Sequence, residues 1–264
     1  MAEIRFGTDG WRAVIAAEFT FERVQRVAQA AARVLSRTYA GNGIVVGYDN
    51  RFLSPEFATA TAEAIASLGI PVMLASSAAP TPAFSWLAYQ QRCHGALVLT
   101  ASHNPANYCG IKVKGGFGGS VTAALSRDIE ADLKPSLHHK SQAAITAIDP
   151  WPSYCAQLAS QVDLAAIRAC SAKIWIDAMH GSAAGGMTRL LGDRVIELRR
   201  QRDPLFRHVH DTGVHSADKL PVFVPGKQPL FLARPPFLGA VARQVLHEGL
   251  FGLPARISGG KFGR

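Results

Sequence analysis

The residues most suited to chemistry in this chain are a serine and a lysine ten positions apart. Ser102 lies in the run Thr100-Ala101-Ser102-His103-Asn104-Pro105, and Lys112 follows in Tyr108-Cys109-Gly110-Ile111-Lys112. A serine hydroxyl is a poor nucleophile unless a base activates it or it already carries the transferring group. No G-x-S-x-G elbow surrounds Ser102, and His103, adjacent on an extended turn, is expected to point elsewhere, which argues against acyl transfer. The pattern therefore favours phosphoryl transfer.

A phosphate on Ser102 would need positive charge around it, because it would carry about −1.5 to −2 charges at neutral pH. The candidate cations are Lys112, Lys114, Arg12 and His103. Lys112 would also suit a general base acting on a sugar hydroxyl. The competing interpretation is that Lys112 and Lys114 are exposed strand residues, as most lysines are. The residues alone leave these alternatives open.

The apolar segment Gly95 to Leu99 predicts a buried strand that presents Ser102 at its carboxyl end, where open α/β sheets usually hold ligands. Strand and helix signals alternate around it, and this alternation predicts a layered α/β domain with a largely parallel sheet. The predicted strands are 43–49, 70–75, 95–100 and 111–114. The predicted helices are 21–35, with Thr20 as its cap, the one opened by Ser54-Pro55-Glu56, 81–91 and 121–133.

The second half of the chain is less regular. Residues 134–152, with three prolines and little periodicity, are the best linker candidate. One βαβ unit follows: a helix over 154–169, a strand over 173–178, a glycine-rich turn into a helix ending at Leu191, and a strand over 195–199. Past Phe206 there are six of the 15 prolines, four of the nine histidines and only three acidic residues. This composition predicts a poorly ordered tail with one helix near 240–247.

Composition restricts the class of protein. With 48% hydrophobic residues the chain can bury a sizeable core, and its net charge of +9 comes from scattered residues rather than a basic run with interleaved aromatics. Nucleic acid is therefore a disfavoured partner. The four cysteines form no C-x-x-C pair, which fits a reducing compartment. No apolar stretch of signal-peptide or membrane-span length is present, so we expect a cytoplasmic protein without membrane contact.

Three ordered motifs give the chain a specific resemblance to the α-D-phosphohexomutases, the phosphoglucomutase and phosphomannomutase superfamily. They are Phe6-Gly7-Thr8-Asp9-Gly10-Trp11-Arg12, Gly47-Tyr48-Asp49-Asn50-Arg51 and the run from Thr100 to Lys112. The resemblance extends from Ile4 to Phe206. It implies a three-layer α/β/α domain with a mixed sheet over residues 1–135, an incomplete second α/β domain over 136–206, and a non-family tail over 207–264.

The resemblance also implies an activity: interconversion of hexose 1-phosphate and hexose 6-phosphate through a bisphosphorylated sugar, with Mg²⁺ as cofactor and hexose 1,6-bisphosphate as activator. Ser102 would be the phosphoryl carrier and a metal ligand through its phosphate, and Lys112 the general acid/base. Arg12 and His103 would flank the phosphoryl group, and Asn104 would help to fix the loop.

The family's aspartate-rich Mg²⁺ loop and its two further domains have no counterpart after Phe206. We therefore expect a truncated chain that is inactive alone, with residues 207–264 arising from a frameshift or another truncating event. Two alternatives remain: a non-catalytic fragment that binds sugar phosphate, and, from a different class, a basic nucleic-acid-binding module.

Overall fold

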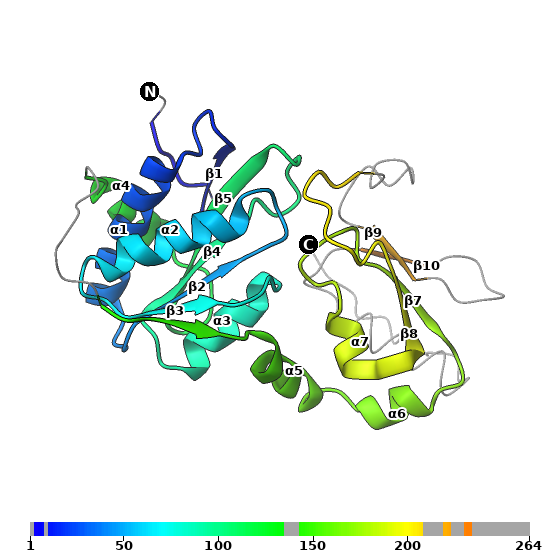
Figure 1. Cartoon of the computed structure of the whole chain (residues 1–264). Helices are drawn as coiled ribbons and strands as arrows, with labels where there is room; N and C mark the ends of the chain where they lie inside the picture. Colours follow the sequence, from blue (N-terminus) through cyan, green and yellow to red (C-terminus); the bar gives the residue numbers. More distant parts are fainter. Residues whose placement is uncertain (1–2, 8–9, 135–142, 208–218, 223–229, 234–264) are drawn as a thin grey trace, which may run out of the picture.

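A computed structural model describes residues 3–7, 10–134, 143–207, 219–222 and 230–233 (Figure 1). Its main feature is a six-stranded sheet with the strand order β1-β5-β4-β2-β3-β6. The strands are β1 (Trp11–Val14), β2 (Ile44–Tyr48), β3 (Val72–Ala75), β4 (Gly95–Leu99), β5 (Tyr108–Gly115) and β6 (Ile145–Ile148).

The sheet is mixed, as the family resemblance implies. β4, β2, β3 and β6 pair in parallel, whereas β5 runs antiparallel to both β4 and β1. The expectation of a largely parallel sheet, drawn from the alternation of elements, is therefore correct only for β4, β2, β3 and β6. The reversal at β5 follows from the short loop after β4, because a few residues can only return the chain antiparallel.

Helices cover both faces of the sheet and make three layers. α1 (Phe21–Thr38), α2 (Ser54–Ala66) and α4 (Ala123–Ala131) lie on one face, and α3 (Thr81–Gln90) and α5 (Trp151–Ala159) on the other (Figure 1). Each face has its own buried cluster. Leu97 and Leu99 of β4 pack under α1 and α2, while Ala96 and Val98 pack under α3. β4 is buried on both sides, as its continuous apolar run predicted.

Local signals explain most helix positions. α1 begins where Thr20, in an extended conformation, accepts a hydrogen bond from the Arg23 amide at 3.4 Å, so the predicted cap is confirmed. α2 and α3 each have a proline in the first turn, where a missing N–H costs nothing. The helix predicted over 154–169 is two helices, α5 and α6 (Leu164–Ala169), because Asp163 accepts from the Ala166 amide and starts a new helix.

The linker prediction for 134–152 is wrong for most of its described residues. Ile145–Ile148 forms β6, which pairs with β3 as the last strand of the six-stranded sheet, although it lies after residue 135. α5 then begins at Trp151. Three of the four β6 residues are exposed, as befits a strand at the sheet edge. The division of the chain at 135 and 206 itself stays a prediction.

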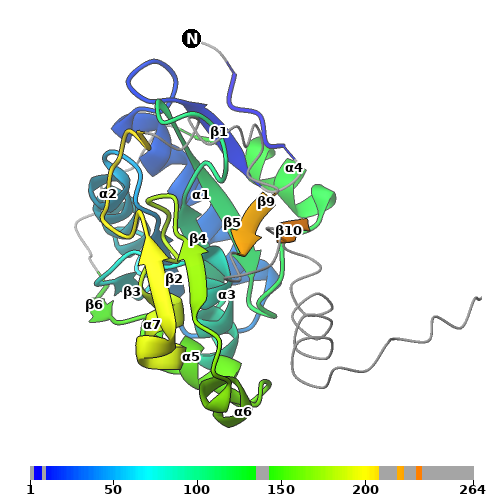
Figure 2. The same cartoon turned by 90° about the vertical axis from the view of Figure 1, so that its right-hand side faces the viewer.

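The βαβ unit is confirmed: β7 (Ile174–Asp177), α7 (Gly186–Leu191), the 3₁₀ turn η1 (Gly192–Arg194) and β8 (Val195–Leu198), with β7 and β8 parallel. Beyond residue 206, where no element except a helix near 240–247 was expected, β9 (Lys219–Val222) and β10 (Leu230–Ala233) form an antiparallel pair, with β9 beside β7 (Figure 2). The helix expected near 240–247 lies outside the described residues.

Candidate functional site

The predicted serine lies where the sequence indicated, three residues past the end of β4. Ser102 is exposed and has a positive φ of 58°, a left-handed conformation that non-glycine residues seldom adopt. Its amide donates to the Thr100 hydroxyl at 3.0 Å, and the Asn104 amide donates to the Ala101 carbonyl at 3.1 Å. The turn therefore holds the serine hydroxyl outward at the carboxyl edge of the parallel strands.

His103 does not point away from the serine, so that expectation is wrong. Its Nδ1 lies 3.3 Å from the Ser102 hydroxyl oxygen. The left-handed backbone at Ser102 is the physical reason: consecutive side chains diverge on an extended segment but converge on a tight turn of this kind. The two groups share a polar surface at the tip of the loop.

The structure also brings together Arg12 and Asn104, which lie 92 residues apart in the sequence. Arg12 on β1 lies opposite Gly110 in the β1–β5 ladder, and its guanidinium donates to the Asn104 side-chain oxygen at 3.0 Å. This contact places one cation beside the serine loop. The fixing role that the family resemblance gives to Asn104 stays a prediction.

Lys112 lies on β5 opposite Val98, whose side chain packs under α3, so Lys112 emerges on the α3 side of the sheet. There it lines an open groove of about 630 Å³ together with Thr81, Trp86, Tyr89, Lys114 and Phe117. Lys114 is buried rather than an exposed strand residue, and its ammonium donates to the Ser120 hydroxyl at 2.7 Å. Ser102 is not among the residues that line this groove.

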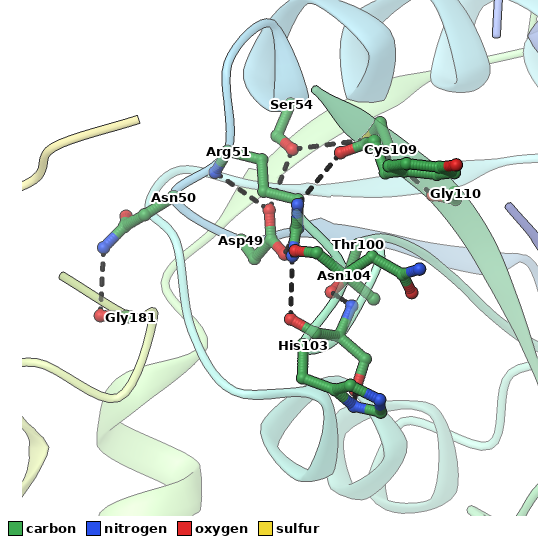
Figure 3. Close-up of polar contacts among 12 residues, drawn as sticks. Asp49, Asn50, Arg51, Ser54, Thr100, His103, Asn104, Cys109, Gly110 and Gly181 are labelled. Carbon is green, nitrogen blue, oxygen red and sulfur yellow. Dashed lines mark hydrogen bonds and ion pairs between the residues drawn. The ribbon is translucent and has the colours of Figure 1, made fainter. Parts of the chain in front are cut away.

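The residue that sequence reasoning missed is Arg51. It was quoted as part of a motif without a role, yet its side chain is only 2% exposed and reaches under the serine loop (Figure 3). Its two terminal nitrogens donate to four carbonyl oxygens of the loop, those of Ser102 (2.9 Å), Asn104 (2.6 Å), Pro105 (2.8 Å) and Tyr108 (3.0 Å).

Asp49 supplies the negative charge that this buried cation needs. Its carboxylate lies 3.4 Å from Arg51 Nε and also accepts from the Arg51 amide at 3.0 Å and the Ser54 hydroxyl at 2.9 Å. Burial lowers the pKa of the Arg51 guanidinium, and the Asp49 charge opposes that shift. Nearby, burial and then the charge of Asp49 raise the pKa of the Cys109 thiol to about 12, so Cys109 is a packing residue and no nucleophile.

A magnesium ion would find few ligands among the described residues. No three histidine, cysteine, aspartate or glutamate side chains gather in any place within them. The Asp49 carboxylate is already engaged by Arg51 and Ser54. The donor set that this part of the chain offers therefore does not fit Mg²⁺ by itself.

The fold and the loop together define an α/β protein with a ligand edge at the carboxyl ends of its parallel strands. Residues 3–138 match the model of the family described as phosphoglucomutase/phosphomannomutase, alpha/beta/alpha domain I. The chain belongs to this family, and what matches is an N-terminal part of a phosphohexomutase, a family of intramolecular phosphotransferases.

Relatives and solved structures agree. A phosphoglucosamine mutase of Carboxydothermus hydrogenoformans is 39% identical over 47% of this chain and 28% of its own length. One of Shewanella sediminis is 31% identical over 84% of this chain and 51% of its own length. The crystal structure of a putative phosphomannomutase from Thermus thermophilus has a TM-score of 0.75 at 34% identity, covering 85% of this chain and 58% of that one.

The chain spans about half or less of the curated relatives that it matches. The alignment with the Shewanella sediminis relative covers 229 residues, more than the segment from Ile4 to Phe206 in which the sequence showed its resemblance.

No helix among the described residues is long and apolar enough to cross a membrane.

Proposed function

We propose that this chain carries the phosphoserine part of a phosphohexomutase site, in which Ser102 accepts a phosphoryl group and passes it to a hexose phosphate. The observation that carries the proposal is the presentation of Ser102: its hydroxyl is exposed on a left-handed turn whose carbonyls are held from beneath by a buried guanidinium. In-line phosphoryl transfer depends mainly on positioning and on charge near the transferring group, and this loop supplies both.

Four other residues would take the remaining roles. When a sugar hydroxyl attacks the phosphoserine, a bond from the sugar oxygen to phosphorus forms and the bond from Ser102 Oγ to phosphorus breaks. Lys112 would take the hydroxyl proton as general base. His103, whose Nδ1 lies 3.3 Å from Ser102 Oγ, would give a proton to the leaving serine oxygen. Arg12, held by Asn104, would stabilise the charge on the phosphoryl oxygens.

The substrate class that we propose is a hexose phosphate, exchanged between its 1- and 6-phosphates, with hexose 1,6-bisphosphate as the phosphoryl donor that activates the serine. Mg²⁺ is the cofactor that the family generally uses. Because the described residues do not complete a site for it, we assign it no ligand beyond a phosphate on Ser102, and no step above depends on it. We also propose a cytoplasmic location, as expected from the sequence.

Intact-mass analysis of the full chain after incubation with glucose 1,6-bisphosphate tests the carrier role. We expect the wild type to gain the mass of one phosphate and Ser102→Ala to gain none, while the exposed Ser160→Ala control behaves as wild type. A phosphate that persists in Ser102→Ala, or a wild type that never gains one, contradicts the proposal.

A coupled assay of glucose 1-phosphate conversion then separates two candidates. Phosphate gain with turnover identifies a complete mutase. Phosphate gain without turnover identifies the fragment that binds and accepts phosphate, the outcome expected from the sequence.

A further inference from the structure

The backbone that carries Arg51 is clamped by the second α/β unit, the residues from Ile174 to Phe206. Arg202 donates to the Asn50 carbonyl at 3.1 Å and to the Arg51 carbonyl at 2.9 Å. The Phe206 ring centre lies 5.3 Å from the Arg51 guanidinium carbon. A segment some 150 residues further along the chain thus contacts both the backbone carbonyl and the guanidinium group of Arg51.

Asn50 makes the reciprocal contact. Its side-chain amide donates to the His180 and Gly181 carbonyls, each at 3.0 Å, in the turn that follows β7 (Figure 3). Contacts therefore run in both directions between the Asn50–Arg51 segment and the second unit. Arg51, whose carbonyl receives the second unit on one side, supports the Ser102 loop with its side chain on the other.

We propose that Arg51 is the positioning residue of the Ser102 loop and that contact with Arg202 and Phe206 of the second unit sets its position. The inference rests on the proposed function of Ser102, which it deepens by naming what holds the serine in its reactive geometry. Arg51 is not a catalytic residue, because a side chain 2% exposed beneath the loop acts on the serine only through the loop backbone.

The geometry of the guanidinium group explains how Arg51 can hold this loop. The left-handed turn at Ser102 is intrinsically unfavourable and persists only if its surroundings over-determine it. Two nitrogens of one rigid planar fork each bind two loop carbonyls, which fixes the two sides of the turn relative to each other. A lysine keeps the charge but presents a single nitrogen, so it cannot hold all four carbonyls in this arrangement.

The first experiment compares wild type with Arg51→Lys in the full chain. Intact mass gives the rate of phosphate gain as a function of glucose 1,6-bisphosphate concentration, and hydrogen exchange follows the amides of residues 101–108. We expect the maximal rate to fall about tenfold or more, because small misplacements of a reacting group have effects of this size. The half-saturating concentration should stay within about twofold of wild type, because Arg51 is buried beneath the loop rather than exposed to ligand. Exchange of the loop amides should rise while that of α1 does not.

The second experiment uses Arg202→Ala, which leaves the side chains of the loop and of Arg51 unchanged. This variant tests the proposal if Arg51→Lys fails to fold. We expect faster exchange in 101–108 and a severalfold lower maximal rate. The matched control is Arg200→Ala, whose exposed side chain lies near Glu197 of its own unit and should change neither quantity.

The outcomes are distinguishable. Unchanged loop exchange and unchanged maximal rate in folded Arg51→Lys or in Arg202→Ala overturn the inference, and so does a rise in the half-saturating concentration without a fall in maximal rate. A wild type that takes no phosphate refutes the role of Ser102, and loop exchange alone then decides the role of Arg51.

Discussion

Gly110 lies at a crowded backbone position beside the serine loop, and replacing it by alanine tests how rigidly that loop is built. A Cβ at this position would lie 2.6 Å from the Trp11 carbonyl oxygen, 2.8 Å from the Thr100 carbonyl oxygen and 2.8 Å from Arg12 Cγ. The two carbonyls belong to backbone on opposite sides of β5, because Gly110 pairs with Arg12 of β1 and its carbonyl accepts from the Thr100 amide at 2.9 Å. Neither side can move away without breaking a ladder.

The expected cost follows from these contacts. Overpacking a well-packed site costs about 1–3 kcal/mol, and we expect about 3 kcal/mol for Gly110→Ala because two of the three closest atoms are backbone. For a chain of this size, about 2–4 °C of melting temperature is lost per kcal/mol, so the melting temperature should fall by about 6–12 °C. Thermal and urea unfolding followed by circular dichroism measure both quantities.

Gly7→Ala is the matched control, because a Cβ there would meet nothing closer than the Gly10 carbonyl oxygen at 3.7 Å. We expect this variant to stay within about 0.5 kcal/mol of wild type. If Gly110→Ala is as stable as Gly7→Ala, the strands beside the loop can separate without cost. That result would refute the expectation, drawn from the close contacts around Gly110, that the backbone beside the serine loop is rigid.

Two further predictions concern titrating groups. Burial raises the pKa of Cys93 to about 11 and that of Cys109 to about 12. At pH 8 neither of these thiols should therefore react with a disulfide reagent in the native chain, whereas all four cysteines should react in guanidinium. Rapid labelling of Cys93 or Cys109 in the native chain, located by peptide mass, would contradict their burial. For Asp177, burial tends to raise the pKa, but hydrogen bonds from Arg199 and from the Met179 amide, together with nearby positive charge, outweigh burial and the pKa is lowered. A carboxyl with a lowered folded-state pKa stabilises the fold above its unfolded pKa of about 3.9, and this contribution disappears as the pH falls through the folded value. Urea unfolding between pH 6 and pH 3 should therefore show a smaller acid loss of stability for Asp177→Asn than for wild type, with the exposed Asp193→Asn as control; identical pH profiles for Asp177→Asn and wild type would contradict the shift.

The elements that the sequence predicted well are those whose signals are local. The apolar run of β4 and the capped, amphipathic pattern of α1 each specify their structure without help from distant residues. The serine loop was located for the same reason, since its strand and its residue types are contiguous. α1 extends three residues beyond its predicted end, which is within the usual uncertainty of helix boundaries.

The elements that the sequence did not predict are defined by tertiary pairing. β1 reads Trp-Arg-Ala-Val and β6 reads Ile-Thr-Ala-Ile. The β-branched residues of β6 favour a strand, but a segment of four residues is too short to specify one by periodicity. Each becomes a strand because an exposed edge, β5 for one and β3 for the other, offers unpaired backbone groups. No pattern within four residues carries that information.

The sequence did not predict the role of Arg51, for a related reason. Its partners on the loop are carbonyl oxygens, which every residue type possesses, so no complementary side chain marks the contact. The one available signal was Asp49, a carboxylate two residues earlier that could accompany a buried arginine. Arg12 was named because it ends a recognisable motif, Phe6 to Arg12, whereas its contact with Asn104 was not predicted.

The burial of Arg51 has a consequence for how the loop can move. A buried guanidinium that loses one set of partners is left with unsatisfied donors, and this costs more than the contact contributed. The four loop carbonyls, Asp49 and Phe206 therefore stabilise one another as a group, and partial release of the loop is less favourable than complete release. Because Arg202 of the second unit holds the backbone of this arginine, separation of the two units would loosen that backbone and, through it, the whole group. The geometry of Ser102 is thus a property of both α/β units together, although every residue of its loop belongs to the first.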